Sequence, residues 1–160
     1  MFEKFRIHIS QVFVVLLIVL ICVSRSLWEY KVPFVSEGLF LLGSVLVGIA
    51  SLGRLWCSVY IAGYKTEHLV TKGPYSMCRN PLYFFSLLGA LGLGFATESF
   101  LIPLFILIGF AVYYPFVIKS EERELAKLHK NEFEVYLKKV PTFFPKLSYL
   151  VSIHGNNLLE

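Results

Sequence analysis

TKGPYSMCRNPLYF, residues 71–84, places one glycine, two prolines and a lone arginine directly before an extremely apolar run. Pro81 suits the first turn of a helix, where its missing N–H costs nothing, so the stretch predicts that an apolar helix begins there. Arg79 and Asn80 then lie at the mouth of that helix. Two plain interpretations are a topology anchor for Arg79 and a helix cap for Asn80. A third is a pocket that holds a charged ligand at a membrane surface.

The composition is that of an integral membrane protein. Of the 160 residues, 56% are hydrophobic and only 16% are charged, whereas a soluble domain carries about a quarter charged residues. The net charge of +4 fits lipid headgroups and topology better than nucleic acid, since no basic face interleaved with aromatic residues is present. The three cysteines, Cys22, Cys57 and Cys78, are far apart, so the sequence predicts neither a disulfide framework nor a metal site.

Four apolar blocks predict an all-α, polytopic membrane protein with about four transmembrane helices. The blocks run from Ile7 to Val23, from near Glu37 to about Tyr64, from Pro81 to Ala96 and from Phe100 to Ile118. A cleaved signal peptide is the alternative for the first block, but no A-x-A-like cleavage site follows it. A tight turn at Thr97-Glu98-Ser99 makes a hairpin of the last two blocks.

Small residues four positions apart predict where these helices approach one another closely. The pairs are Ser44 and Gly48 in the second block, with Ala90 and Gly94, and Gly92 and Ala96, in the third. Pro103 and Pro115 lie inside the fourth block. Because an internal proline bends a helix, Pro115 is expected to shape the exit of that block.

The segment 119–139, KSEERELAKLHKNEFEVYLKK, predicts a separate C-terminal amphipathic helix after the fourth block. It is rich in strong helix formers, and its apolar residues fall roughly on one face: Leu125, Leu128, Phe133 and Tyr136. Pro141 predicts the end of this helix. Taken alone, the segment would rest on the membrane surface or on the other helices.

The placement of lysine and arginine predicts the orientation of the chain. With four spans, nearly all of the basic residues fall on one side: before the first block, between the second and third blocks, and in the tail. The positive-inside rule puts that side, with both termini, in the cytoplasm. The chain is expected to form a single domain, 1–160, with N-terminal helices in 1–64, a core of loop, hairpin and C-terminal helix in 65–146, and a tail in 147–160.

A group of polar and charged side chains is expected at the open end of the hairpin. Glu121 and Glu122 directly follow the fourth block, so the hairpin brings them near Asn80 on the same membrane face. Carboxylates at a helix start are also favoured by the helix dipole, which leaves a structural interpretation open. Together with Arg79, however, the two carboxylates provide a positive and a negative partner for the opposite charges of a zwitterionic ligand. Tyr75 and Tyr83 would supply flat surface for an aromatic ring.

Three motifs follow one another along the chain: HLVTKGPYSMCRNPLY at 68–83, the pair EE at 121–122, and YLKKVPTFFP at 136–145. In order and spacing they resemble the isoprenylcysteine carboxyl methyltransferase family, which has bacterial integral-membrane members and is similar to the phospholipid N-methyltransferases. The resemblance covers roughly Arg54 to Pro145. It implies S-adenosyl-L-methionine as cofactor, bound at the cytoplasmic face of a bacterial-type inner membrane, and a lipophilic acceptor that enters from the bilayer, among membrane lipids.

The resemblance also assigns residues. It implies a cofactor site lined by His68, Leu69, Val70, Tyr75, Asn80, Pro81, Leu82, Tyr83 and Glu121. Arg79 and Glu122 complete the motifs and are the expected catalytic pair. The chain departs from the family at two positions: Asn80 replaces the usual histidine, and Val117 stands where the eukaryotic enzymes have an arginine for the substrate carboxylate. Lys119 is the cation nearest to that position. Because the arginine for the substrate carboxylate is missing, the resemblance defines the methyl donor better than the acceptor.

The resemblance implies direct methyl transfer by in-line displacement, without a covalent enzyme intermediate. A carboxylate acceptor is already nucleophilic, so O-methyl transfer is favoured over N-methyl transfer, for which Glu122 or His129 would take the proton. His129 lies in a charged helix and is expected to be a solvated surface residue. Two alternatives are a sterol-reductase-like, NADPH-dependent membrane reductase, whose motifs are similar but whose chains are much longer, and a non-catalytic membrane scaffold.

Overall fold

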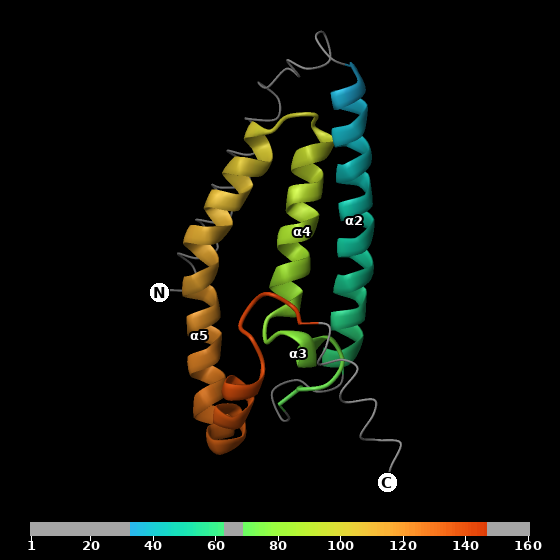
Figure 1. Ribbon diagram of the computed structural model, residues 1–160. Helices are drawn as coiled ribbons and strands as arrows, with labels where there is room; N and C mark the ends of the chain where they lie inside the picture. The colour runs from blue at the N-terminus through green and yellow to red at the C-terminus, as the bar shows by residue number, and fades with distance from the viewer. Residues whose placement is uncertain (1–32, 63–68, 147–160) are drawn as a thin grey trace.

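The computed structural model describes residues 33–62 and 69–146. Four helices occur in these residues: α2 (Pro33–Ile61), α3 (Pro74–Met77), α4 (Pro81–Ala96) and α5 (Leu101–Lys139). No strand occurs in this part of the chain, so the all-α prediction is confirmed for it. α4 lies between α2 and α5, and α3 lies at one end of the bundle (Figure 1). The first apolar block, His68 and the tail 147–160 lie outside the described residues.

α2 and α5 are long and apolar enough to cross a membrane. The most apolar 18-residue window has a mean hydropathy of 1.9 in α2 and 2.3 in α5, and many large apolar side chains of the two helices are exposed, with Phe34 and Phe116 among the most exposed. An exposed apolar surface is what a lipid-facing helix presents. α4 is apolar but shorter, with 16 residues. The described residues therefore hold two candidate spans, and the predicted count of four is not confirmed.

α2 and α4 pack closely through glycines. A Cβ atom on Gly43 would lie 2.5 Å from the carbonyl oxygen of Gly92 and 2.5 Å from the backbone nitrogen of Ala96. The predicted pair Gly92 and Ala96 is therefore a close approach. The prediction for Ser44 and Gly48 is not tested, because nothing in residues 33–62 and 69–146 lies within 4 Å of a Cβ atom on Gly48 and the first apolar block lies outside the described residues. One residue rotates a helix by about 100°, so the interface follows Gly43 rather than its neighbour.

The fourth block and the expected tail helix form one element, α5. The segment 119–139 contains no glycine or proline and consists largely of strong helix formers, so nothing ends the helix at the predicted boundary after Ile118. Within α5 the backbone departs from helical dihedrals at Lys130 (φ 26°, ψ −105°) and not at Pro115. The chain turns at that residue, and its last helical residues lie beside α3 (Figure 1). The boundary predicted after Ile118 is therefore wrong, since the helical chain divides at Lys130 instead.

The predicted tight turn connects α4 to α5. The backbone N–H of Thr97 donates to the Gly94 carbonyl at 3.3 Å, and that of Glu98 donates to the Phe95 carbonyl at 2.9 Å. The hydroxyl of Ser36, in the first turn of α2, donates to the carboxylate of Glu98. This turn lies at the end of the bundle opposite α3 (Figure 1). The predicted site residues that the structure describes therefore gather at the other end.

Candidate active site

A short loop and α3 form one side of the site. Gly73 has a φ of 62°, a conformation that favours glycine, and a Cβ atom there would lie 2.4 Å from the ring of Tyr60. The Ser76 hydroxyl donates to the Gly73 carbonyl at 2.7 Å. Cys78 is buried, and this burial raises the pKa of its thiol to about 12. The Cys78 thiol is therefore a packing group rather than a nucleophile.

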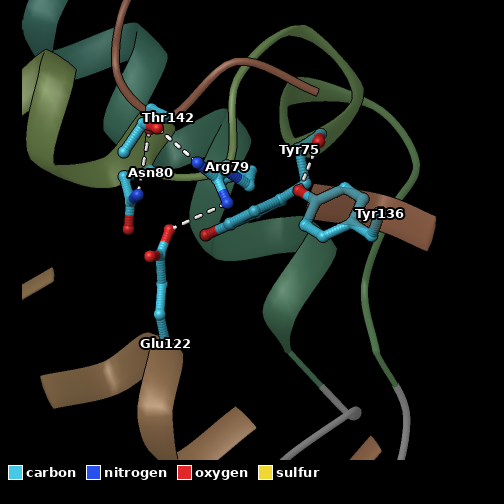
Figure 2. A network of polar contacts seen from close by, with 6 residues as sticks. All are labelled: Tyr75, Arg79, Asn80, Glu122, Tyr136 and Thr142. Atoms are coloured by element: carbon cyan, nitrogen blue, oxygen red, sulfur yellow. Dashed lines mark hydrogen bonds and ion pairs between the residues drawn. The ribbon is translucent and has the colours of Figure 1, made fainter. Parts of the chain in front are cut away.

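The segment that follows α5, residues 141–146, closes over the mouth of α4. The backbone N–H of Arg79 donates to the Pro141 carbonyl at 2.9 Å. Asn80 donates from Nδ2 to the Thr142 carbonyl at 3.0 Å (Figure 2). Asn80 stands at the N-cap position of α4 but makes no side-chain cap hydrogen bond. The interpretation of Asn80 as a simple helix cap is therefore wrong, since its amide fastens the closing segment instead.

Arg79 joins three parts of the chain. Its Nη1 lies 3.2 Å from Oε1 of Glu122 on α5, and its Nη2 donates to the hydroxyl of Thr142 (Figure 2). Only 13% of the Arg79 side chain and 25% of the Glu122 side chain are exposed, so the ion pair is better shielded from water than a surface pair. Arg79 is held inside the site and does not extend to the headgroups, as a topology anchor would.

Two tyrosines complete the connections around the site. Tyr83 of α4 donates its hydroxyl to Oε1 of Glu121 at 2.8 Å. Tyr136, near the end of α5, donates its hydroxyl to the Tyr75 carbonyl at 2.6 Å (Figure 2). Together with the ion pair, these bonds bring the two consecutive glutamates to the mouth of α4, as the hairpin arrangement predicts.

These contacts surround a cavity of about 390 Å³, a size typical of small-molecule sites. Its lining contains nine of the predicted site residues: Leu69, Val70, Tyr75, Arg79, Asn80, Leu82, Tyr83, Glu121 and Glu122. Pro81 is buried at the first position of α4, next to the cavity, and His68 lies outside the described residues. The structure therefore gathers at one site nearly every residue that the motifs indicate.

Four buried polar atoms at the cavity have no hydrogen-bond partner within the described part of the chain. Oε1 of Glu122 is one of them and forms the ion pair with Arg79; the other three are the hydroxyl of Tyr75, Nε of Arg79 and Nε2 of His129. Buried polar atoms in folded proteins normally have partners, so these three atoms are available to a bound ligand. Burial raises the pKa of the Tyr75 hydroxyl above its ordinary value, which keeps it protonated and able to donate.

The cavity wall is anionic. Glu121, Glu122 and Glu124 lie on it with one arginine, Arg79, so the charged groups leave a net negative charge. The rest of the wall is largely apolar, with Phe133 and several leucines. Such a cavity suits a ligand that carries net positive charge and an apolar or aromatic part.

Sequence reasoning missed part of this site. It expected a solvated His129, whereas this residue lines the cavity and its Nε2 is buried. The sequence analysis included Thr142 in a motif but did not predict the hydrogen bonds that this residue accepts from Arg79 and Asn80. The signal for the remainder was the apolar face of the expected tail helix, whose members line the cavity: Leu125, Leu128, Phe133 and Tyr136.

The fold and the site define a membrane-associated helical protein with a ligand-sized cavity at one end of its bundle. Residues 32–132 match the phospholipid methyltransferase family. The chain belongs to this family of membrane methyltransferases, and the resemblance drawn from the three motifs is confirmed.

Two relatives are similar over most of the chain. They are the cobalt-zinc-cadmium resistance protein CzcN of Cupriavidus metallidurans, 43% identical over 145 residues, and the nickel-cobalt-cadmium resistance protein NccN of Alcaligenes xylosoxydans xylosoxydans, 41% identical over 145 residues. Each alignment covers 91% of this chain, and 66% and 67% of the respective relative. The chain thus spans about two thirds of the length of these proteins. No solved structure matches it.

Proposed function

We propose that this chain transfers a methyl group from S-adenosyl-L-methionine to a membrane-embedded lipid or lipidated acceptor, such as an isoprenylcysteine-like carboxylate. The observation that carries the proposal is the anionic cavity at one end of the apolar bundle, which offers buried polar atoms to a ligand. Family membership supports methyl-transfer chemistry and favours it over a membrane reductase or a non-catalytic scaffold.

The chemistry of the cofactor matches the cavity wall. S-adenosyl-L-methionine carries a sulfonium and an ammonium group beside one carboxylate, so its net charge is positive and complements the anionic wall. Arg79 would pair with the carboxylate. Glu121 would accept from the ammonium group or the ribose hydroxyls, and the Tyr75 hydroxyl would donate to a polar atom of the ligand. The apolar residues Leu69 and Val70 would cover the adenine.

Positioning by the protein provides most of the catalysis in this proposal. When bound, the cofactor supplies an electrophilic methyl group for in-line displacement. The ion pair between Arg79 and Glu122 fixes α5 against the mouth of α4 and so defines the position of the acceptor. A carboxylate acceptor needs no base, which favours O-methyl transfer. An amine acceptor would instead give its proton to Glu122 or His129.

The distribution of charge supports a cytoplasmic site within a single domain whose methyltransferase core is 65–146. The end of the bundle that carries α3 also carries most of the basic residues described: Lys72, Lys119, Arg123, Lys127, Lys130, Lys138, Lys139 and Lys146. The turn 97–100 at the opposite end has no lysine or arginine. By the positive-inside rule, the end with the cavity faces the cytoplasm of a bacterial-type inner membrane.

Titration calorimetry on the purified protein in detergent is expected to detect binding of S-adenosyl-L-methionine and none of NADPH. Glu121→Gln is expected to weaken cofactor binding roughly tenfold, because it removes a charged hydrogen-bond partner while keeping the side-chain volume. Glu134→Gln, at an exposed position of α5 outside the cavity, is the matched control and should bind as the wild type does. Absence of cofactor binding by the wild type, or equal binding by Glu121→Gln, contradicts the proposal, and binding of NADPH supports the reductase.

The relatives suggest a physiological setting, and we extend the proposal to it: methyl transfer by this chain supports growth in the presence of cobalt, zinc or cadmium. The support is the 43% identity to a cobalt-zinc-cadmium resistance protein. Expression of the wild type in a metal-sensitive bacterium is expected to raise the cadmium concentration that halves growth, whereas Arg79→Ala at the same membrane level should not. Equal tolerance with the wild type and with an empty vector contradicts this setting.

A further inference from the structure

Arg54 is a cation within a helix that is otherwise suited to lipid. It lies about two turns before the end of α2, inside the candidate span Phe34–Ile61. Charged side chains at such positions are costly, and they normally face protein, a partner or a polar cavity rather than lipid. The guanidinium of Arg54 is therefore expected to have polar or charged partners.

One partner of Arg54 is a serine that connects it to the mouth of α4. Nη1 of Arg54 donates to Oγ of Ser86 at 2.6 Å. The Ser86 hydroxyl donates its own hydrogen to the Leu82 carbonyl at 2.7 Å, so its oxygen is oriented to accept from the guanidinium. Leu82 lines the cavity. The guanidinium is thus anchored about one helical turn from the cavity.

A row of aromatic rings begins at Tyr83, about one helical turn from Ser86, and leads to the glutamates of α5. Tyr114 packs edge to face on Tyr83, with ring centroids 5.0 Å apart, and Tyr83 donates to Glu121 at 2.8 Å. Phe110, one turn deeper in α5, stacks on Tyr114 at 3.8 Å. The row leads from membrane depth to the cavity.

The guanidinium of Arg54 retains donors for a further partner. An arginine carries five N–H donors. Within residues 33–62 and 69–146, Arg54 donates to the Ser86 hydroxyl and forms no ion pair, and its side chain is exposed. Arg79, by contrast, already has Glu122 and Thr142 as partners, and in the proposed function its remaining donor serves the carboxylate of the cofactor. An anionic group beside Arg54 would supply the charged partner that the protein does not provide in these residues.

We propose that Arg54 binds the anionic group of the lipophilic acceptor and thereby selects acids over amines and neutral lipids. This inference rests on the proposed function and names the substrate class of the same site. The apolar chain of the acceptor would lie along the aromatic row of α4 and α5, and its acidic group would meet the guanidinium next to the cavity. The phosphate groups of bilayer lipids are also anionic. A competition experiment distinguishes binding of these headgroups from binding of an acceptor.

Binding of two probes to the purified protein in neutral detergent tests the inference. The probes are S-farnesylcysteine, which has a free carboxylate, and its carboxamide, which has none. The wild type is expected to bind the acid roughly tenfold more tightly than the amide, and Arg54→Gln is expected to lose this preference. Arg54→Lys should keep part of it, since a point charge replaces a planar fork. Lys138→Gln removes the same charge from an exposed position of α5 outside the cavity and should keep the full preference.

Two further measurements distinguish an acceptor site at Arg54 from a cofactor contact and from a headgroup anchor. Arg54 is not part of the cavity wall, so Arg54→Gln is expected to bind S-adenosyl-L-methionine as the wild type does, which tests the proposed function independently. Phosphatidylglycerol in excess should not displace the acid. Displacement would overturn the inference, because Arg54 would then be an anchor for bilayer headgroups.

The remaining outcomes are equally decisive. Equal affinity of the wild type for the acid and the amide, absence of acid binding, or a preference that survives in Arg54→Gln would each overturn the inference. Ser86→Ala removes the anchor of the guanidinium but keeps its charge, and it is expected to reduce the preference severalfold. This variant provides the test if Arg54→Gln does not fold.

Discussion

Arg79→Ala is expected to lower kcat/KM for methyl transfer by about a hundredfold. The substitution removes the ion pair with Glu122 and the bond to the Thr142 hydroxyl. A hydrogen bond to a charged group contributes about 1.5–3 kcal/mol, and each 1.36 kcal/mol corresponds to a factor of about ten in rate. Glu122 then keeps its charge in a largely shielded position beside Glu121, without its cation. Transfer of a radiolabelled methyl group to membrane lipid extract measures the loss.

Two controls separate the site from the fold in this experiment. Arg79→Lys keeps the charge but cannot span Glu122 and Thr142 with a planar fork, so an intermediate rate is expected. Arg123→Ala removes an exposed cation on α5 and should transfer methyl groups at the wild-type rate. If Arg79→Ala were as active as Arg123→Ala, the assignment of Arg79 to the site would be wrong.

Local sequence chemistry was sufficient to locate the ends of α4. Pro81 begins the helix as its position predicts, and the turn after Ala96 follows the expected residues. These features depend on the backbone preferences of a few neighbouring residues, and such preferences can be inferred from a single sequence. The prediction that a helix ends after Ile118 was wrong. It also relied on a local signal, which was only a change from apolar to charged residues. Such a change marks where a helix leaves a membrane and not where it ends.

Contacts between distant residues could be predicted where the hairpin or a motif linked them. The hairpin of the last two blocks brought Arg79 near Glu122 on one membrane face, and the structure joins them at 3.2 Å. Nothing local in the sequence distinguishes Asn80 as a cap from Asn80 as a donor to Thr142, which follows 62 positions later. Burial of His129 depends in the same way on the turn at Lys130, a residue with no helix-breaking side chain. The stretch before Pro81 therefore lines a cavity whose other residues lie far along the chain.

Gly43→Ala is expected to destabilise the bundle by roughly 1–3 kcal/mol, the usual cost of overpacking. The new Cβ atom would lie 2.5 Å from backbone atoms of Gly92 and Ala96. Backbone atoms cannot rotate away as a side chain can, so α2 must move off α4. Separation of α2 from α4 would also shift Arg54 away from Ser86, since the two residues face each other across this interface. Thermal unfolding of the purified variant in detergent, followed by circular dichroism, measures the change.

Gly48→Ala is the matched control, because it makes the same substitution in the same helix where no atom of the described residues lies within 4 Å of the new Cβ atom. In a helix interior, alanine is favoured over glycine by roughly 0.5–1 kcal/mol. Gly48→Ala should therefore leave the melting temperature unchanged or raise it, while Gly43→Ala lowers it. Since helix propensity changes equally at both positions, the difference between the two variants isolates the close approach of α2 and α4. Equal melting temperatures would mean that the helices do not pack through Gly43 in the folded protein.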